Sequence, residues 1–168
     1  MVDAPSSGAS PAGHSSAELG RFLETRRGTI LDASMASLGR AHLHHYTVEG
    51  IEHARRRMEK LLDVTTQCVR EMDVVLMLTH AESVARERFW SGYGLAEVQT
   101  AFNVLEETIW SRMLQELDAG DFARALGVVG TVLGMGKDAL ARTWVSLATR
   151  TRVPSLDLRT LLEGSGGN

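Results

Sequence analysis

Residues 92–110 read GYGLAEVQTAFNVLEETIW and carry the clearest helical pattern in the chain. From Leu95 onward the apolar residues recur at steps of three and four, the spacing that places side chains on one face of an α-helix. We therefore predict a helix that runs from this stretch to about Leu117 and buries one continuous apolar stripe in a core. The stripe consists of Leu95, Val98, Ala101, Phe102, Leu105, Ile109 and Met113.

The same helix carries apolar residues beside its stripe. Trp110, Leu114 and Leu117 lie next to the stripe at about 100° per residue, so the apolar arc is wider than one neighbouring layer covers. Another helix of the same chain or a second subunit would cover this extra surface. Symmetric pairs are the commonest oligomers, so we expect a homodimer and take these three residues as its candidate interface.

The rest of the chain is also helical in pattern. No stretch alternates with a period of two, and only three prolines interrupt the chain. We predict an all-α fold, a single bundle of about five to six helices. Further helices are expected to start at the capping residues Ser15, Thr47, Asp73 and Asp121. Gly28 is expected to kink or divide the first helix, Gly120 to end the helix from residue 95, and the segment 134–138, GMGKD, is a candidate break in the last.

Three segments are expected along the chain. Residues 1–14 hold almost nothing to bury and predict a disordered tail. Residues 15–152 predict one all-α domain, because 168 residues are enough for a single well-buried core. Residues 153–168 predict a short helical turn and a flexible tail.

Composition argues against several partners. A formal charge of −3, from 18 basic and 21 acidic residues, gives no electrostatic reason to bind nucleic acid or an anionic membrane. The longest apolar run, near residues 122–135, is well short of the roughly 20 residues that span a bilayer. The chain start has no secretion signal and Cys68 is the lone cysteine, so we expect a cytoplasmic protein.

Few residues suggest chemistry. His42, His45 and His80 are the candidate metal or haem ligands, but no closed set of four ligands is apparent, so we expect no cofactor. Cys68 has no histidine at a fixed short spacing and is expected to be buried packing. The consecutive Arg55, Arg56 and Arg57 fan around their helix and are expected to lie on a solvated face. No residues suggest catalysis, and we expect no enzyme.

The glycines of GVVGTVLGMGKDAL, residues 127–140, do not form a phosphate loop, because Thr131 stands where the first glycine is required. Gly127, Gly130 and Gly134 instead predict a smooth helix face that another backbone approaches closely, or the border of a small cavity. We favour packing over a cavity.

The stretch RERFWSGYGLAEVQTAFNVLEETIW resembles the N-terminal sensor domains of the RsbR/RsbRD stressosome co-antagonist family. The shared pattern is Arg88, Gly92, Leu95 and Glu97, followed by an aromatic-bearing helix, and residues 22–38 are similar to that family's first helix. The resemblance covers about residues 17–150. It implies a globin-like fold that usually lacks haem, pairs as a dimer and serves as signal input to stress-response or transcriptional regulators.

One departure from the family is visible. Its members commonly carry a C-terminal output domain such as a STAS domain, and these residues include none. The resemblance therefore implies either output through an associated signalling protein or a sequence that is part of a longer chain.

The leading hypothesis is a non-enzymatic sensory and dimerisation module that responds to a ligand or a partner. Trp90, Tyr93 and Phe102, near the Gly92 turn, are the candidate residues for binding a small molecule. The alternative is a haem- or metal-binding globin-like sensor or small oxidoreductase on the same helices.

Overall fold

The computed structural model describes residues 16–40 and 50–152 and folds them into six α-helices. The described residues form no strand, which confirms the predicted all-α class. The predicted N-terminal tail, the Thr47 helix start and the C-terminal turn lie outside the described residues. The helices are α1 (Ser16–Thr25), α2 (Arg27–Arg40), α4 (Ile51–Glu71), α5 (Val75–Trp90), α6 (Leu95–Glu116) and α7 (Ala119–Arg152).

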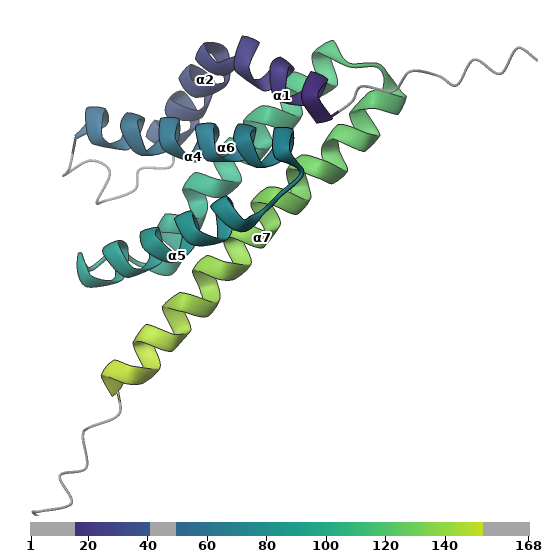
Figure 1. Cartoon of the computed structure of the whole chain (residues 1–168). Helices are drawn as coiled ribbons and strands as arrows, with labels where there is room; N and C mark the ends of the chain where they lie inside the picture. Colours follow the sequence, from purple (N-terminus) through teal and green to yellow (C-terminus); the bar gives the residue numbers. More distant parts are fainter. Residues whose placement is uncertain (1–15, 41–49, 153–168) are drawn as a thin grey trace, which may run out of the picture.

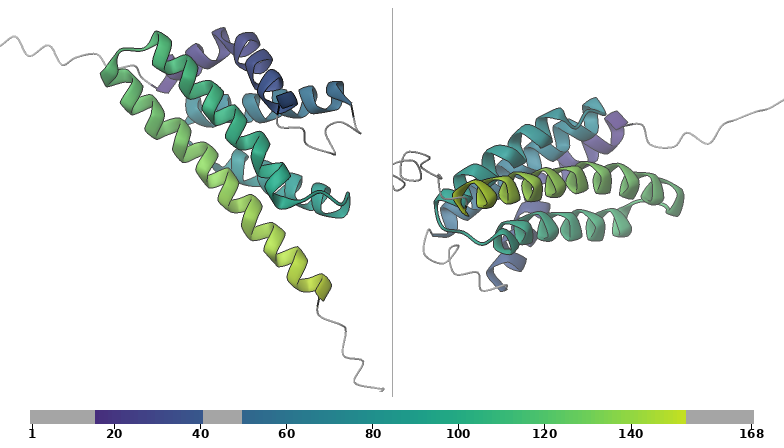
Figure 2. Two further views of the ribbon diagram at one scale, coloured as in Figure 1. Left: turned by 180° about the vertical axis from the view of Figure 1, so that it is seen from behind. Right: turned by 90° about the horizontal axis from the view of Figure 1, so that it is seen from below.

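Helix α7 is the long element along which the bundle is arranged (Figure 1). It is 34 residues long, and its last turns project past the other helices. Helices α6 and α7 form an antiparallel pair that lies side by side in both views of Figure 2. Helix α5 packs along α7, while α1 and α2 cover the other side of α4 and α6.

The first predicted helix is divided, two residues before the glycine that was expected to divide it. The break lies at Arg26, and Gly28 belongs to the first turn of α2. The Thr25 hydroxyl donates to the Arg21 carbonyl oxygen at 2.8 Å, and the Thr29 hydroxyl donates to that of Arg26 at 2.9 Å. Such hydroxyl bonds to the preceding turn can bend helices, but α4 carries two of them, at Thr65 and Thr66, without a break, so they do not explain its position here.

The predicted starts of α5 and α6 are confirmed to within a residue or two. The Asp73 carboxylate accepts the Val75 N–H at 2.9 Å at the beginning of α5. Helix α6 begins at Leu95, after a turn in which Gly92 has a φ of 81°. A left-handed φ is costly for residues with a Cβ, so the turn needs this glycine.

The predicted start of the last helix is wrong. Asp118, not Asp121, caps α7, since its Oδ1 accepts the N–H groups of Gly120 at 3.0 Å and of Asp121 at 2.9 Å. Gly120 therefore lies within the first turn of α7 and does not end the preceding helix, which ends at Glu116.

The candidate break at 134–138 is not a break, because α7 is continuous there. A Cβ at Gly136 would lie 2.8 Å from Met77 Sδ and 3.0 Å from Phe102 Cε1, so the missing side chain lets α7 approach α5 and α6. Beside it, the Lys137 ammonium donates to Glu106 at 2.6 Å on α6. These contacts outweigh the low helix propensity of glycine, which costs about 1 kcal/mol per residue.

The favoured prediction that another backbone packs closely on the earlier glycines of α7 is also wrong. Apart from the chain neighbours and the backbone of α7 itself, no described heavy atom lies within 4 Å of a Cβ built at Gly127, Gly130 or Gly134, so no other helix approaches them closely. Gly127 instead lines a hollow beside Cys68 and Val128, which fits the cavity alternative at that one position.

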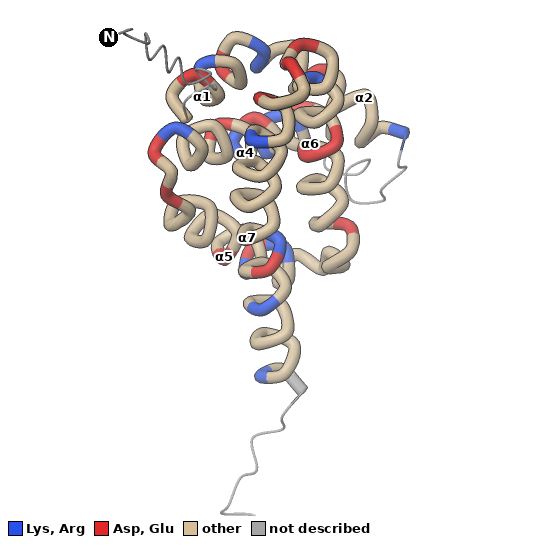
Figure 3. Tube along the Cα trace, turned by 90° about the vertical axis from the view of Figure 1, so that its right-hand side faces the viewer, with Lys and Arg blue, Asp and Glu red and all other residues tan. Residues whose placement is uncertain are grey.

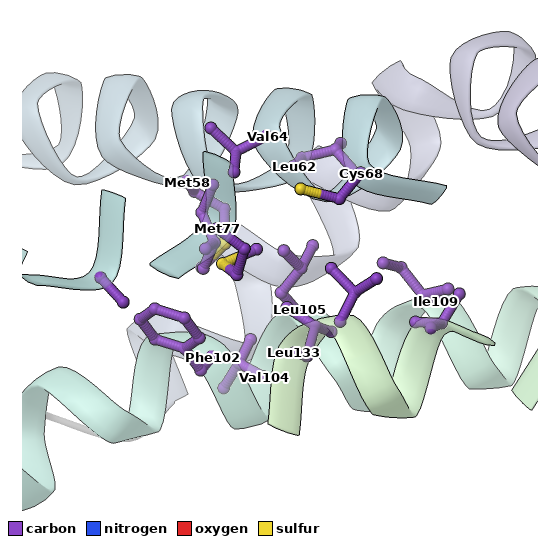
Figure 4. Packing of buried hydrophobic residues seen from close by; sticks show 14 of the residues in the cluster. Met58, Leu62, Val64, Cys68, Met77, Phe102, Val104, Leu105, Ile109 and Leu133 are labelled. Carbon is purple, nitrogen blue, oxygen red and sulfur yellow. The ribbon is translucent and has the colours of Figure 1, made fainter. Parts of the chain in front are cut away.

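The predicted stripe of α6 forms the centre of the core (Figure 4). Phe102, Leu105 and Ile109 meet α4 side chains and Leu133 of α7 in that view, and all are at most 2 % exposed. Cys68 is 1 % exposed within the same core, which confirms it as buried packing. Charges of both signs are interspersed over the outside of the bundle (Figure 3). Across the described ranges, no helix has the length and apolar character needed to cross a membrane.

Candidate functional site

A cavity of about 280 Å³ lies between α4, α5 and α6. Its volume is close to the lower end of the roughly 300–1,000 Å³ typical of ligand pockets. Its floor is apolar and its rim is charged. The floor consists of Ala54, Met58, Leu61, Val84, Val98, Ala101 and Phe102, and the rim of His53, Arg56, Arg57, Lys60, His80, Glu87 and Arg88.

Helical spacing explains why these side chains converge. On α4, His53, Arg57 and Lys60 follow one another at steps of four and three, so one face of the helix presents them together. On α5, the cavity residues His80, Val84 and Glu87 follow at steps of four and three. Two helices therefore supply the polar rim, while α6 supplies only apolar side chains to the lining.

Two arginines of the rim are built into the fold around Tyr93. Tyr93 is 5 % exposed, and its hydroxyl oxygen accepts a hydrogen bond from Arg57 Nη1 at 3.2 Å. The Arg88 guanidinium lies 4.7 Å from the centre of the Tyr93 ring and forms an ion pair with Glu87 at 3.1 Å. At 5 % exposure, Arg88 is a buried charge held by an aromatic face and a carboxylate.

The other two cations of the rim differ from this pair. Arg56 and Lys60 are exposed and form no hydrogen bond or ion pair with any residue that the structure describes. They stand one helical turn apart on α4, so their side chains are neighbours of like charge. The rim thus offers two cationic groups that are not committed to the described fold.

His80 adds a neutral imidazole to the rim. Its pKa is lowered from the ordinary value of 6.5, first because burial disfavours the charged ring and then because Lys60 is nearby, while Glu87 acts in the opposite direction. The ring is therefore uncharged near neutral pH and can donate one hydrogen bond and accept another.

The residues predicted to bind a small molecule do not all come together. Phe102 is 2 % exposed and lines the cavity floor, and Tyr93 lies behind the rim. Trp90 is 69 % exposed and does not line the cavity; its ring packs edge-on against Phe89, which in turn meets Trp144 of α7. Phe102 is thus the one of the three that is in the cavity lining.

The residues predicted to form the dimer interface lie on the last half of α6 and, for Leu117, at its C-cap. Trp110 is 37 % exposed and Leu114 is 67 % exposed, so both present apolar surface to solvent. Leu117 is half-buried, packs against the core and lines a second hollow with Phe22 and Asp121.

The candidate metal ligands are only partly described. His42 and His45 lie outside the described residues, and His80 lies in the cavity rim with His53. The described ranges hold no group of three or more side chains that could bind a metal ion together. Burial raises the pKa of the Cys68 thiol, which keeps it protonated and unreactive.

Sequence reasoning missed the cationic part of this site. Arg56 was expected on a solvated face together with Arg55 and Arg57, and Lys60 was not singled out. The prediction that the three arginines fan around the helix is confirmed: Arg55 reaches Asp32 at 2.9 Å, Arg57 reaches Tyr93, and Arg56 stays at the rim. No local signal set Arg56 and Lys60 apart, because Glu52 and Glu59 lie one turn from Arg56, as expected of an ordinary solvated helix face.

Comparison with protein-family models, with curated proteins and with solved structures finds no match to this chain. The function therefore has to be argued from the cavity and the exposed apolar surface of α6.

Proposed function

We propose that this protein is a non-enzymatic signal-input and dimerisation module of a bacterial stress-response or transcription regulatory system in the cytoplasm. The observation that carries the proposal is the cavity between α4, α5 and α6, with its apolar floor and polar rim. Ligand sites in proteins commonly combine these two features. A small molecule held there is the signal, and a downstream signalling protein is the receiver.

Helix α6 provides the physical link between the cavity and the pairing surface. Val98 and Phe102 line the cavity, while Trp110 and Leu114 expose apolar surface farther along the same helix. Phe102 and Trp110 are eight positions apart, roughly 12 Å along the helix axis. A ligand that wedges between α4, α5 and α6 would bias the packing of α6, and with it the dimer, to the extent that its affinity differs between the two arrangements.

The resemblance to RsbR-type sensor domains supports the same proposal. Of its pattern residues, Arg88 lines the cavity, Gly92 makes the α5–α6 turn, and Leu95 and Glu97 lie in the first turn of α6. The pattern residues therefore lie at the junction between α5 and α6, at the edge of the cavity.

Sedimentation equilibrium at tens of micromolar tests the pairing. We expect the native chain to sediment as a dimer and the Trp110→Glu variant to sediment as a monomer. Dimerisation of the variant would bury an unpaired carboxylate in an apolar interface, and removing that charge from water is costly. The matched control is Val75→Glu, since Val75 is 61 % exposed in the first turn of α5 and is not part of the surface on α6. A native chain that is strictly monomeric would contradict the dimer.

One observation favours the alternative, a haem- or metal-binding sensor or small oxidoreductase. His53 and His80 line the same cavity, and the lowered pKa of His80 keeps its imidazole in the neutral form that binds metals. The absorption spectrum and the metal content of the purified protein test this alternative. Stoichiometric haem or metal that is lost in His80→Ala would establish it in place of the ligand-sensing module.

A further inference from the structure

We propose that the cavity between α4, α5 and α6 binds a free medium-chain carboxylate, with the aliphatic tail on the apolar floor and the carboxylate between Arg56 and Lys60. This inference rests on the proposed function, in which the cavity holds a small molecule, and it adds the chemical class of that molecule.

The floor selects an apolar tail. Met58, Val84, Val98 and Phe102 present methyl, thioether and aromatic surface, and no charged side chain comes from α6. An apolar cavity of about 150 Å³ binds benzene, so a volume of about 280 Å³ holds roughly eleven non-hydrogen atoms on the same scale. This size matches a carboxylate of about eight to ten carbons, and is too small for the long acyl chain of a membrane lipid.

The rim selects a negative head group. Arg56, Arg57, Lys60 and Arg88 bring four positive charges to the rim, against one carboxylate, that of Glu87. Glu87 is already in an ion pair with Arg88. The charged side chains that line the opening are therefore mostly positive, although the chain as a whole is slightly acidic.

Arg56 and Lys60 are the cations placed to receive the carboxylate. Both are exposed, and neither has a hydrogen bond or an ion pair to any described residue. Arg56 and Lys60 repel each other as like charges one turn apart, and an anion between them removes that repulsion. Glu52 and Glu59 also lie one turn from Arg56, but neither forms an ion pair with it in the described residues. A planar guanidinium also matches the two oxygens of a carboxylate. A bare inorganic anion would satisfy this rim but would leave the apolar floor unfilled.

Methionine-methyl NMR of the full chain tests binding, with octanoate as the probe. The methyl group of Met58 lies in the cavity lining, whereas Met113 is buried outside it and serves as an internal control. We expect octanoate to shift the Met58 signal in a saturable way and to leave Met113 in place. We expect 1-octanol, which has the same tail and no charge, to bind roughly five- to tenfold more weakly, because it lacks the charge-assisted contacts.

Two pairs of variants separate the head group from the tail. Arg56→Gln combined with Lys60→Gln should weaken octanoate binding by roughly five- to tenfold and leave 1-octanol unchanged, and should remove the loss of affinity at high salt. Arg150→Gln is the matched control, since Arg150 is an exposed residue of α7 outside the cavity. Ala101→Trp should fill the cavity and abolish binding of both probes, whereas Ala96→Trp, on the exposed side of α6, should not.

The outcomes distinguish the ligand class from the wider proposal. If octanoate and 1-octanol shift Met58 with equal affinity, the cavity binds a ligand as proposed but the anion assignment is overturned. If octanoate leaves Met58 unmoved, or if only vesicles of anionic lipid move it, the free-carboxylate assignment is overturned. The charge variants keep the test decisive should Ala101→Trp fail to fold. The dimer test under the proposed function does not depend on any of these results.

Discussion

The two flanks of α4 use the same kinds of charged residue in opposite ways. On the flank that faces α1 and α2, three arginine–carboxylate pairs cross between helices: Arg27 with Asp63, Arg55 with Asp32, and Arg70 with Glu24. On the flank that faces the cavity, Arg56 and Lys60 have no such partner among the described residues. The first flank uses its charges to hold helices together, and the second leaves them open to an anion.

This difference teaches that a run of arginines on one helix has no single role. Consecutive side chains on α4 point about 100° apart, so each meets a different neighbour. Where a neighbouring helix offers a carboxylate, the arginine pairs with it. Where the neighbouring helices offer an apolar hollow, the cation stays at the edge.

The largest effect is expected at Phe102, which belongs both to the cavity floor and to the hydrophobic core. Phe102→Ala should lower the free energy of unfolding by about 3–5 kcal/mol, because the ring is 2 % exposed and also contacts the α7 backbone near Gly136. Urea denaturation followed by circular dichroism measures this change. Glu107→Ala, on the exposed side of the same helix, is the control and should stay within about 0.5 kcal/mol. A loss at Phe102 no larger than that of the control would show that the ring is not part of a packed core.

A smaller effect is expected from breaking one pair on the first flank. Arg27 donates two hydrogen bonds to Asp63, at 2.8 Å and 3.2 Å, and both side chains are well exposed. Arg27→Gln should therefore lower the free energy of unfolding by about 0.5–1 kcal/mol in the same denaturation measurement. This is toward the upper end of what solvent-exposed ion pairs contribute. The matched change on the other flank, Arg56→Gln, should stay within about 0.5 kcal/mol of zero, because Arg56 forms no ion pair with a described residue and its repulsion from Lys60 is offset by Glu52 and Glu59, one turn away. Equal losses from both substitutions would remove the distinction between the flanks.

The smallest effect is expected from pH and concerns His80 in the rim. Its folded-state pKa is below the ordinary value of 6.5, so the unfolded chain takes up a proton first as the pH falls. The stabilising contribution is present above pH 6.5 and is lost as the pH decreases through the folded-state pKa. His80→Gln should flatten this part of the profile of unfolding free energy against pH. A native profile that is unchanged by the substitution would show that His80 does not titrate differently in the two states.

Much of the fold could be predicted from the apolar spacing. The burial of Val98, Leu105, Ile109 and Met113 on one side of α6 follows from steps of seven, four and four, and it is confirmed. The helix starts at Asp73 and Leu95 were readable from an acidic cap and a glycine turn. Errors arose at the start of α7, where Asp118 and Asp121 are both plausible caps and local sequence does not decide between them.

Much less of the candidate site could be predicted. Aromatic side chains near a turn suggested a pocket, and Phe102 does line the cavity. Trp90 lies outside it, because its side chain on α5 is exposed to solvent. Arg56 and Lys60 had no sequence signal strong enough to distinguish them from Arg55. Their difference depends on whether the opposing helix carries a carboxylate, which is a property of two distant segments.

The sequence by itself determined that this protein is helical and which face of α6 is buried, because both follow from local periodicity along one segment. Only the tertiary structure decided that α4, α5 and α6 leave a hollow and that two cations without a partner among the described residues stand at its edge. It also decided that Gly136, and not Gly127, Gly130 or Gly134, is where helices meet closely. The physical reason is that cavities and close approaches are set by the distances between helices, and those distances depend on side chains far apart in the chain.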